Sequence, residues 1–227
     1  MTKLKHLTIG YLLTILLSAC GGGGDGGGDS AGNNNNGAGQ YDLVDYFFHE
    51  NLAVTNSTVS YTVSAYSKDT GEQLIQYTDA FEKTADDTIV WTSSGEPAST
   101  FVITDSRIDE TVHSALDAPR PNQRFVDVGT EYMDATASLP PFGDQNARCT
   151  VTAHHDSIDL ATKTDAYNLA SGIYNDVLEI NCITSFIIEG NLAEHTNLNH
   201  YFARNIGLVF TEGNLFLFGN VYIIPEI

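Results

Sequence analysis

The sequence predicts an all-β domain, built on an antiparallel curved sheet or half-barrel with one or two short helices. The first observation is strict alternation: residues 58–67 place Val59, Tyr61, Val63 and Ala65 on one face and polar side chains on the other. The second is the recurrence of strand-like segments about every 8–12 residues, separated by turn residues. Helical periodicity is scarce. A sandwich fits the same pattern, so the sequence does not choose among these β architectures.

Further strand-like segments follow along the chain. They cover residues 73–81, 87–93, 99–105, 107–115, 148–156, 176–188, 200–205, 207–212 and 214–224. Between the first two strands, Gly71 can supply the positive φ of a turn. Short helices or turns are expected at 41–50 and 165–174. Residues 116–146 are expected to be rich in loops, because prolines interrupt a ladder there, namely Pro119, Pro121, Pro140 and Pro141.

Composition and charge exclude several classes of protein. The chain has 227 residues, with 29 Asp and Glu against 10 Lys and Arg, and a formal charge of −19. Nucleic-acid binding needs clustered basic side chains, so a nucleic-acid partner is not expected. Hydrophobic residues make up 42%, which is enough for a packed core and excludes disorder throughout.

The N-terminal twenty residues predict export. Lys3 and Lys5 precede an apolar run from Leu7 to Leu17, which is too short to span a bilayer and is typical of a secretory signal. The run ends in Leu-Ser-Ala-Cys, and this segment resembles the lipobox of bacterial lipoproteins. That resemblance implies a signal peptide at 1–19, cleavage before Cys20, and lipidation of Cys20. The alternative is an ordinary signal peptide in which Cys20 is incidental.

The same resemblance bears on localisation. Gly21 stands after Cys20, where enteric lipoproteins retained at the inner membrane carry Asp, so the resemblance implies delivery to the cell outer membrane. Residues 20–40 then form a tether rich in Gly and Asn, with a root-mean-square span of roughly 25 Å. This disordered linker leaves residues 41–227 as a single β-rich domain. Contact with the membrane is expected through the lipid, because the acidic domain repels anionic headgroups.

Two cysteines remain after Cys20. Cys149 and Cys182 both lie within predicted strands, and an exported protein enters an oxidising compartment. We therefore predict a structural disulfide between them. A metal site or a catalytic thiol would need partner residues that the sequence does not show nearby.

Other polar residues give no recognisable site. His154 and His155 are adjacent in a strand and point to opposite faces, while His195 and His200 flank an expected turn. Each is interpreted as a polar surface residue. Acidic residues gather weakly at 86–87 and 156–159, without a calcium-binding loop. Motifs of nucleophile elbows, zinc proteases and nucleotide-binding loops are absent, so no metal, no cofactor and no catalytic residue is predicted.

Residues 201–209, Tyr-Phe-Ala-Arg-Asn-Ile-Gly-Leu-Val, resemble a signature of uncharacterised bacterial lipoproteins. In that group the signature forms a late hairpin, with a preceding strand that resembles residues 174–180. The resemblance covers about residues 172–212 and implies a curved sheet like that of lipoprotein carriers, without an established activity. The residues themselves predict a tight turn at 204–207, where Asn205 and Gly207 tolerate left-handed geometry, and an architectural role.

These observations predict a membrane-anchored lipoprotein that acts as a ligand-binding or scaffolding module. One form of the hypothesis is a groove for an apolar or peptide ligand, lined by some of five aromatic residues, Phe47, Phe48, Phe81, Trp91 and Phe101, although core packing suits most of them. The other is a face that contacts an envelope protein. The alternative of another class is an envelope hydrolase, which requires converging carboxylates or a nucleophile beside a base.

Overall fold

A computed structural model describes residues 41–104, 107–112, 119–123, 128–129, 131–133, 137–139, 143–188, 191–215 and 218–227. Within these ranges thirteen strands form one antiparallel sheet, so the all-β prediction is confirmed. The predictions for the signal peptide at 1–19, for Cys20 and for the linker to residue 40 lie outside the described residues. Among the residues that are described, no helix is long and apolar enough to cross a membrane.

The elements follow one another in this order. They are α2 (Leu43–Phe47), η1 (Glu50–Ala53), β1 (Thr58–Ser67), β2 (Gln73–Ala85), β3 (Thr88–Ser93), β4 (Glu96–Ile103), β5 (Arg107–Val112), β6 (Pro119–Gln123), β7 (Glu131–Met133), β8 (Ala137–Leu139), β9 (Gly143–Asp159), α3 (Leu160–Lys163), β10 (Ile173–Ile188), β11 (Asn191–Ala203), β12 (Gly207–Leu215) and β13 (Gly219–Glu226).

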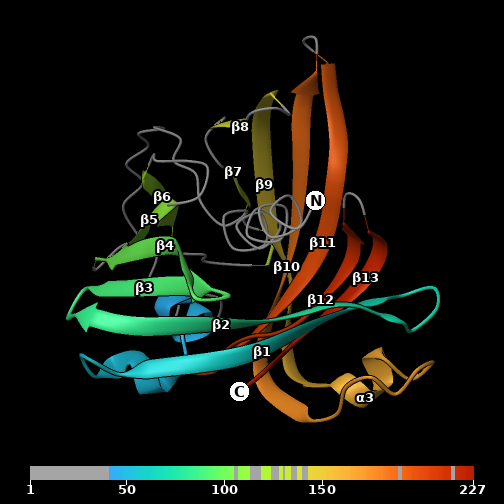
Figure 1. Cartoon of the computed structure of the whole chain (residues 1–227), viewed down its shortest axis with the longest axis horizontal. Helices are drawn as coiled ribbons and strands as arrows, with labels where there is room; N and C mark the ends of the chain where they lie inside the picture. The colour runs from blue at the N-terminus through green and yellow to red at the C-terminus, as the bar shows by residue number, and fades with distance from the viewer. Residues whose placement is uncertain are drawn as a thin grey trace, which may run out of the picture.

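The sheet consists of two meanders joined along one seam. Strands β1 to β6 form the N-terminal wing, and strands β7 to β13 form the C-terminal wing. The seam is the pairing of β1 with β13, in which Thr62 lies opposite Glu226 and Ser67 lies opposite Val221. In Figure 1 the strands of the N-terminal wing run across the view, whereas β9, β10 and β11 run upward. The sheet is therefore strongly curved, as its sequence pattern predicts.

The inner face of the sheet is the face that carries the apolar residues of β1. Val59, Tyr61, Val63 and Ala65 are all buried there, as their alternation predicts. Both wings contribute to the same core cluster; its largest members include Trp91, Phe101, Ile180, Leu198 and Phe202. Because one core spans the seam, the two wings form one hydrophobic unit.

The outer face carries a second, smaller cluster on the C-terminal wing. Leu160 at the start of α3 packs there with Val177, Tyr201 and Phe210. Asp159 caps α3, since its carboxylate accepts a hydrogen bond from the Ala161 amide at 3.0 Å. The helix therefore begins at Leu160, and the prediction of a helix or turn at 165–174 is only half right: residues 164–168 are turns, and Ile173 begins β10.

Segments α2 and η1 lie against the inner face. Leu43, Tyr46, Phe48 and Leu52 are buried, and the ring of Phe47 stacks on Phe202 with 4.4 Å between centroids. The sequence predicts one short helix or turn at 41–50. The structure has two short pieces instead, because Phe48 and His49 adopt extended backbone between them.

Two further expectations were wrong. Pro119 and Pro121 do not interrupt a ladder: they lie in β6, opposite Thr111 and Asp109 of β5. Strand β6 is at the edge of the sheet, where a residue without an amide hydrogen is tolerated. Residues 214–224 do not form one strand, since β12 ends at Leu215 and β13 begins at Gly219, whose φ of 73° belongs to a turn.

Candidate functional site

An apolar cavity of about 40 Å³ lies between the α2–η1 segment and the inner face, beside the seam. The α2–η1 segment contributes Phe47, Phe48, His49 and Leu52; the sheet contributes Tyr61, Val63, Asp79, Phe81, Leu208, Ile223 and Pro225. We call this cavity the Asp79 pocket. One water needs about 10–15 Å³ by such a measure, so the pocket has room for a few water molecules or one small chemical group.

One carboxyl group stands in the apolar wall. Asp79 is in phase with Tyr77 and Phe81 on β2, and only 4% of it is exposed. Ser93 lies directly opposite on β3, and Trp91 is two residues away on the same strand. Within the described part of the chain, Asp79 Oδ1, Ser93 Oγ and Trp91 Nε1 are buried and make no hydrogen bond of good geometry. Ser93 and Trp91 are themselves donors beside this carboxyl and act on its pKa, but they form no well-directed hydrogen bond with Oδ1. A buried carboxyl oxygen without a well-formed bond is rare in a folded core and has room for a further donor.

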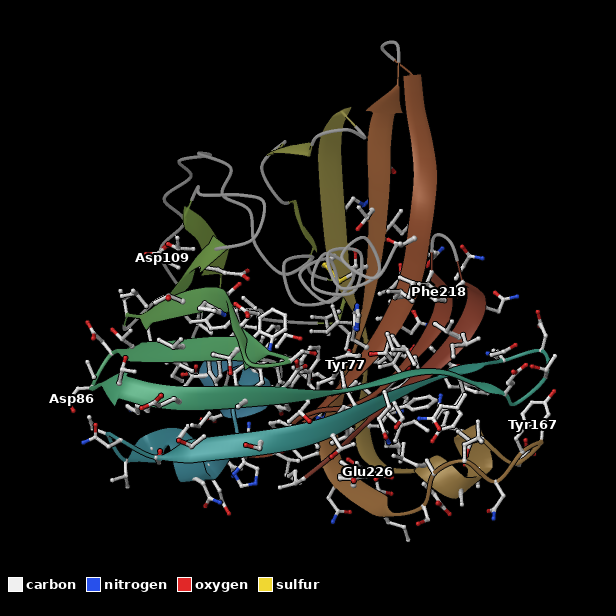
Figure 2. The ribbon with its side chains drawn as sticks, in the orientation of Figure 1. Tyr77, Asp86, Asp109, Tyr167, Phe218 and Glu226 are labelled. Carbon is white, nitrogen blue, oxygen red and sulfur yellow. A yellow bond between two sulfur atoms is a disulfide. The ribbon has the colours of Figure 1, made fainter. Side chains whose placement is uncertain are left out.

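Burial shapes the electrostatics of this carboxyl. It raises the pKa of Asp79 to about 7, although the neighbouring Ser93 and Trp91 side chains act in the opposite direction. Burial, together with the charge of Asp79, also raises the pKa of Tyr77, so this phenol stays neutral. Figure 2 shows Tyr77 near the place where the two wings meet. At neutral pH the pocket therefore presents a carboxyl that is ionised in part of the molecules and accepts a hydrogen bond or a cation.

The hairpin turn between β11 and β12 holds the α2–η1 segment against the sheet, on one side of the pocket. Asn205 and Gly207 have positive φ values of 64° and 94°, as the turn prediction requires. The Asn205 carbonyl accepts a hydrogen bond from the Glu50 amide at 2.7 Å, and the Ile206 carbonyl accepts one from the Tyr61 hydroxyl at 3.0 Å. A Cβ on Gly207 would lie 3.3 Å from the Phe47 carbonyl oxygen. The signature residues 201–209 thus serve architecture here.

A group of polar side chains around Asp176 holds the same segment in place. Asp176 accepts hydrogen bonds from the Tyr46 hydroxyl at 2.6 Å and from His154 Nε2 at 2.7 Å, and its other oxygen lies 3.0 Å from Arg204 Nε. Burial alone would raise the pKa of Asp176, but Tyr46, His154 and Arg204 together lower it. Because its oxygens are occupied, this carboxylate is a structural anchor for α2.

The outer face holds a second group of charges. Glu212 receives hydrogen bonds from Lys68 Nζ at 2.7 Å, from the Tyr201 hydroxyl at 3.1 Å and from Lys163 Nζ at 3.5 Å. Burial would raise the pKa of Glu212, yet the lysines and Tyr201 lower it. A catalytic acid needs a raised pKa, so this cluster does not support the hydrolase alternative.

The histidines divide between the two faces. His154 and His155 pair with Asp176 and Glu179, at 2.7 and 2.8 Å, as polar surface residues do. Both predictions for His200 were wrong: no turn separates it from position 195, since β11 contains both, and it is not a surface residue. His200 is in phase with Leu198 and Phe202 on the inner face, has no exposed area, and contacts Thr211 Oγ1 through Nδ1 at 3.0 Å. Burial lowers the pKa of His200 to about 3, which keeps it neutral.

The structure places the other predicted site residues as follows. Cys149 and Cys182 are opposite one another on β9 and β10 and form a disulfide, as predicted; the bond is visible in Figure 2. Cys20 and the side chain of His195 lie outside the described residues. In the ranges that the structure describes, no group of three or more His, Cys, Asp or Glu residues is arranged to hold a metal ion.

The predicted aromatic groove exists only in part. Phe47, Phe48 and Phe81 line the Asp79 pocket, whereas Trp91 and Phe101 are buried in the core and do not line it. Sequence reasoning missed Asp79 itself. The signal was present, since residues 75–81 alternate Ile, Tyr, Asp and Phe on one side of the strand. A carboxyl group in phase with three apolar residues indicates a buried charge.

Comparisons with known proteins find a limited similarity in shape to solved structures. No family model matches the chain, and no curated protein matches it. A solved structure from Bacteroides fragilis, described as an exported protein with a YmcC-like fold, has a TM-score of 0.39 and 9% identity over 80% of this chain and 98% of that one. A lipoprotein from Parabacteroides distasonis has a TM-score of 0.38 and 10% identity over 80% and 97%. No residue role is carried over from either structure.

Proposed function

We propose that the chain is a lipoprotein of the bacterial cell envelope that binds a segment of another envelope protein. The lipid on Cys20 anchors it at the outer membrane, residues 20–40 act as a flexible tether, and residues 41–227 form the binding domain. The lipobox-like sequence supports the anchor. In the folded part, the Asp79 pocket holds a single carboxyl among apolar side chains, which supports a binding role.

The size of the cavity favours a protein segment over a lipid. Among the described residues, side chains of the core, Trp91 and Phe202 included, fill much of the inner face. The Asp79 pocket, at about 40 Å³, accepts one side chain or a group of similar size. The unpartnered Asp79 oxygen is the observation on which this proposal rests, because a bound partner would supply the missing donor.

The anchor has a direct test. In the variant Cys20→Ala, incorporation of labelled fatty acid should be lost and the protein should leave the membrane fraction. Gly21→Ala is the matched control and should keep both the label and the membrane association. If the Cys20→Ala protein stayed in the membrane after a high-salt wash, the lipid anchor would be refuted.

Partner binding is tested by photo-crosslinking in intact cells. A photoreactive amino acid replaces His49, which lines the pocket, and in a control it replaces Tyr167, which lies in the turns after α3 and does not line the pocket. We expect a protein adduct of one defined mass at position 49 that diminishes in the Asp79→Asn background. Equal adducts at both positions, adducts to lipid alone, or no adduct at position 49 would contradict the proposal.

A further inference from the structure

We infer that the Asp79 pocket binds an ammonium group carried on a short apolar stem, the group that a lysine side chain of the partner presents. This inference rests on the proposed function and specifies its ligand. The pocket joins two chemistries: its walls are almost entirely apolar, and its one buried carboxyl has an oxygen without a hydrogen-bond donor. A ligand that satisfies both must be apolar along its length and must end in a donor.

Charge favours a cationic donor over a neutral one. The residues that line the pocket include no lysine or arginine. Besides Asp79 and Tyr61, the lining includes His49, whose Nδ1 accepts a hydrogen bond from the Asn51 amide at 3.0 Å. Lys83 Nζ is directed to the Ala53 carbonyl at 3.4 Å. A neutral donor would form a hydrogen bond with Oδ1 of Asp79 but leave the negative charge of the carboxylate unpaired. An ammonium ion supplies both the hydrogen bond and the opposite charge.

Size selects lysine over arginine. An ammonium group is compact, while a guanidinium is a planar fork that needs room for five donors. A cavity of about 40 Å³ suits the compact group. Phe47, Phe81 and Tyr61 are among the aromatic residues that line the pocket and supply apolar surface for the stem of the ligand.

The electrostatic field of the whole molecule acts in the same direction. The formal charge of −19 raises the local concentration of cationic partners around the domain. On the outer face, Glu212 already holds two lysines of this chain, Lys68 and Lys163. The inner carboxyl of Asp79 has no such partner within the described residues, and an intermolecular lysine completes the equivalent pair.

The experiment uses three small probes that share one butyl stem: n-butylammonium, 1-butanol and n-butylguanidinium. Each is titrated at pH 8 into the full chain carrying Cys20→Ala, and the methyl signals of Val63, Leu208 and Ile223 are followed by NMR. We expect the ammonium probe to bind at least tenfold more tightly than the alcohol, with the guanidinium probe weaker than the ammonium. In Asp79→Asn the ammonium preference should vanish, while the alcohol still shifts the same methyl signals.

The outcomes separate the two proposals. Glu212→Gln removes a carboxylate from the outer face and, as the matched control, should leave the probe preference unchanged. If the alcohol and the ammonium bind equally to the native chain, or if the preference survives Asp79→Asn, the ammonium inference is overturned while the pocket stands. If no probe shifts the pocket methyls, the proposed binding site fails as well.

Discussion

Two carboxyl groups on opposite faces of the same sheet behave in opposite ways. Glu212 on the outer face is held by Lys68, Lys163 and Tyr201, and its pKa is lowered. Asp79 on the inner face is almost fully buried, has an oxygen without a partner, and has a pKa raised to about 7. The outer carboxylate therefore stabilises the fold, whereas the inner one destabilises it. Such local violations of folding rules are expected at functional sites, and the proposed binding site rests on this one.

The largest expected effect comes from neutralising the inner carboxyl. The folded-state pKa of Asp79 is about 7, above its ordinary value of 3.8, so the folded state loses stability as the pH rises from about 4 to 7. Asp79→Asn should remove this loss. Its free energy of unfolding should exceed that of the native chain by roughly 4 kcal/mol at pH 8 and match it below pH 4.

Urea unfolding at pH 3.5 and pH 8 measures this difference. Asp86→Asn, an exposed position, serves as the control and should change little at either pH. A variant Asp79→Asn that is less stable than the native chain at pH 8 would mean that the buried carboxylate has a partner in the folded state.

The disulfide of the inner face comes next. Removing it with the double substitution Cys149→Ala and Cys182→Ala frees a loop of 33 positions in the unfolded chain. The expected loss is roughly 3–4 kcal/mol in the free energy of unfolding. Urea titrations of the native chain with and without reductant should reproduce the same loss. Two alkylated thiols on the untreated, unfolded native chain would contradict the disulfide itself.

Glu212→Gln sharpens the comparison because its pH dependence has the opposite sign. The folded-state pKa of Glu212 is lowered, so its contribution is present above the ordinary value of 4.5 and is lost as the pH falls through the folded-state value. We expect a loss of about 1–2 kcal/mol at pH 7 and almost none at pH 2, given the usual strength of hydrogen bonds to charged groups. A loss that is equal at both pH values would show that packing, and not charge, is responsible.

The smallest effects concern two tyrosine hydroxyls. Tyr61 donates to the Ile206 carbonyl at 3.0 Å from a buried position, and Tyr167 donates to the Asp69 carbonyl at 2.6 Å from an exposed one. Tyr61→Phe should lower the free energy of unfolding by about 1–2 kcal/mol, since it leaves a buried acceptor unpaired. Tyr167→Phe should cost less than half as much, because water replaces the lost partner. Equal losses in thermal or urea unfolding would break the inner–outer distinction.

The sequence predicts those features that depend on local pattern. The alternation in residues 58–67 predicts β1 and its buried face, and Asn205 with Gly207 predicts the β11–β12 turn. Features that depend on which strands pair with one another are not determined by local pattern. Pro119 and Pro121 were expected to break the ladder because only the strand order shows that β6 is an edge. His200 is expected at the surface because its side chain is polar, although it alternates in phase with the apolar residues Leu198 and Phe202.

The Asp79 pocket was beyond sequence reasoning for a related reason. It combines residues of α2, η1, β1, β2, β12 and β13, and only the pairing of β1 with β13 brings these segments together. The composition of one segment does not indicate which other segments lie beside it in the folded protein. Only one part of the site can be predicted from the sequence: Asp79 lies on the same side of its strand as the apolar residues around it.

The seam between β1 and β13 also sets an order of assembly. Neighbouring strands within each wing follow closely along the chain, so their pairing closes short loops, whereas the seam joins strands from opposite ends of the domain. Either wing can therefore begin to pair on its own, but the wings cannot join before β13 is available. Since the Asp79 pocket is lined from both sides of the seam, it is complete only after the last strand of the chain has paired.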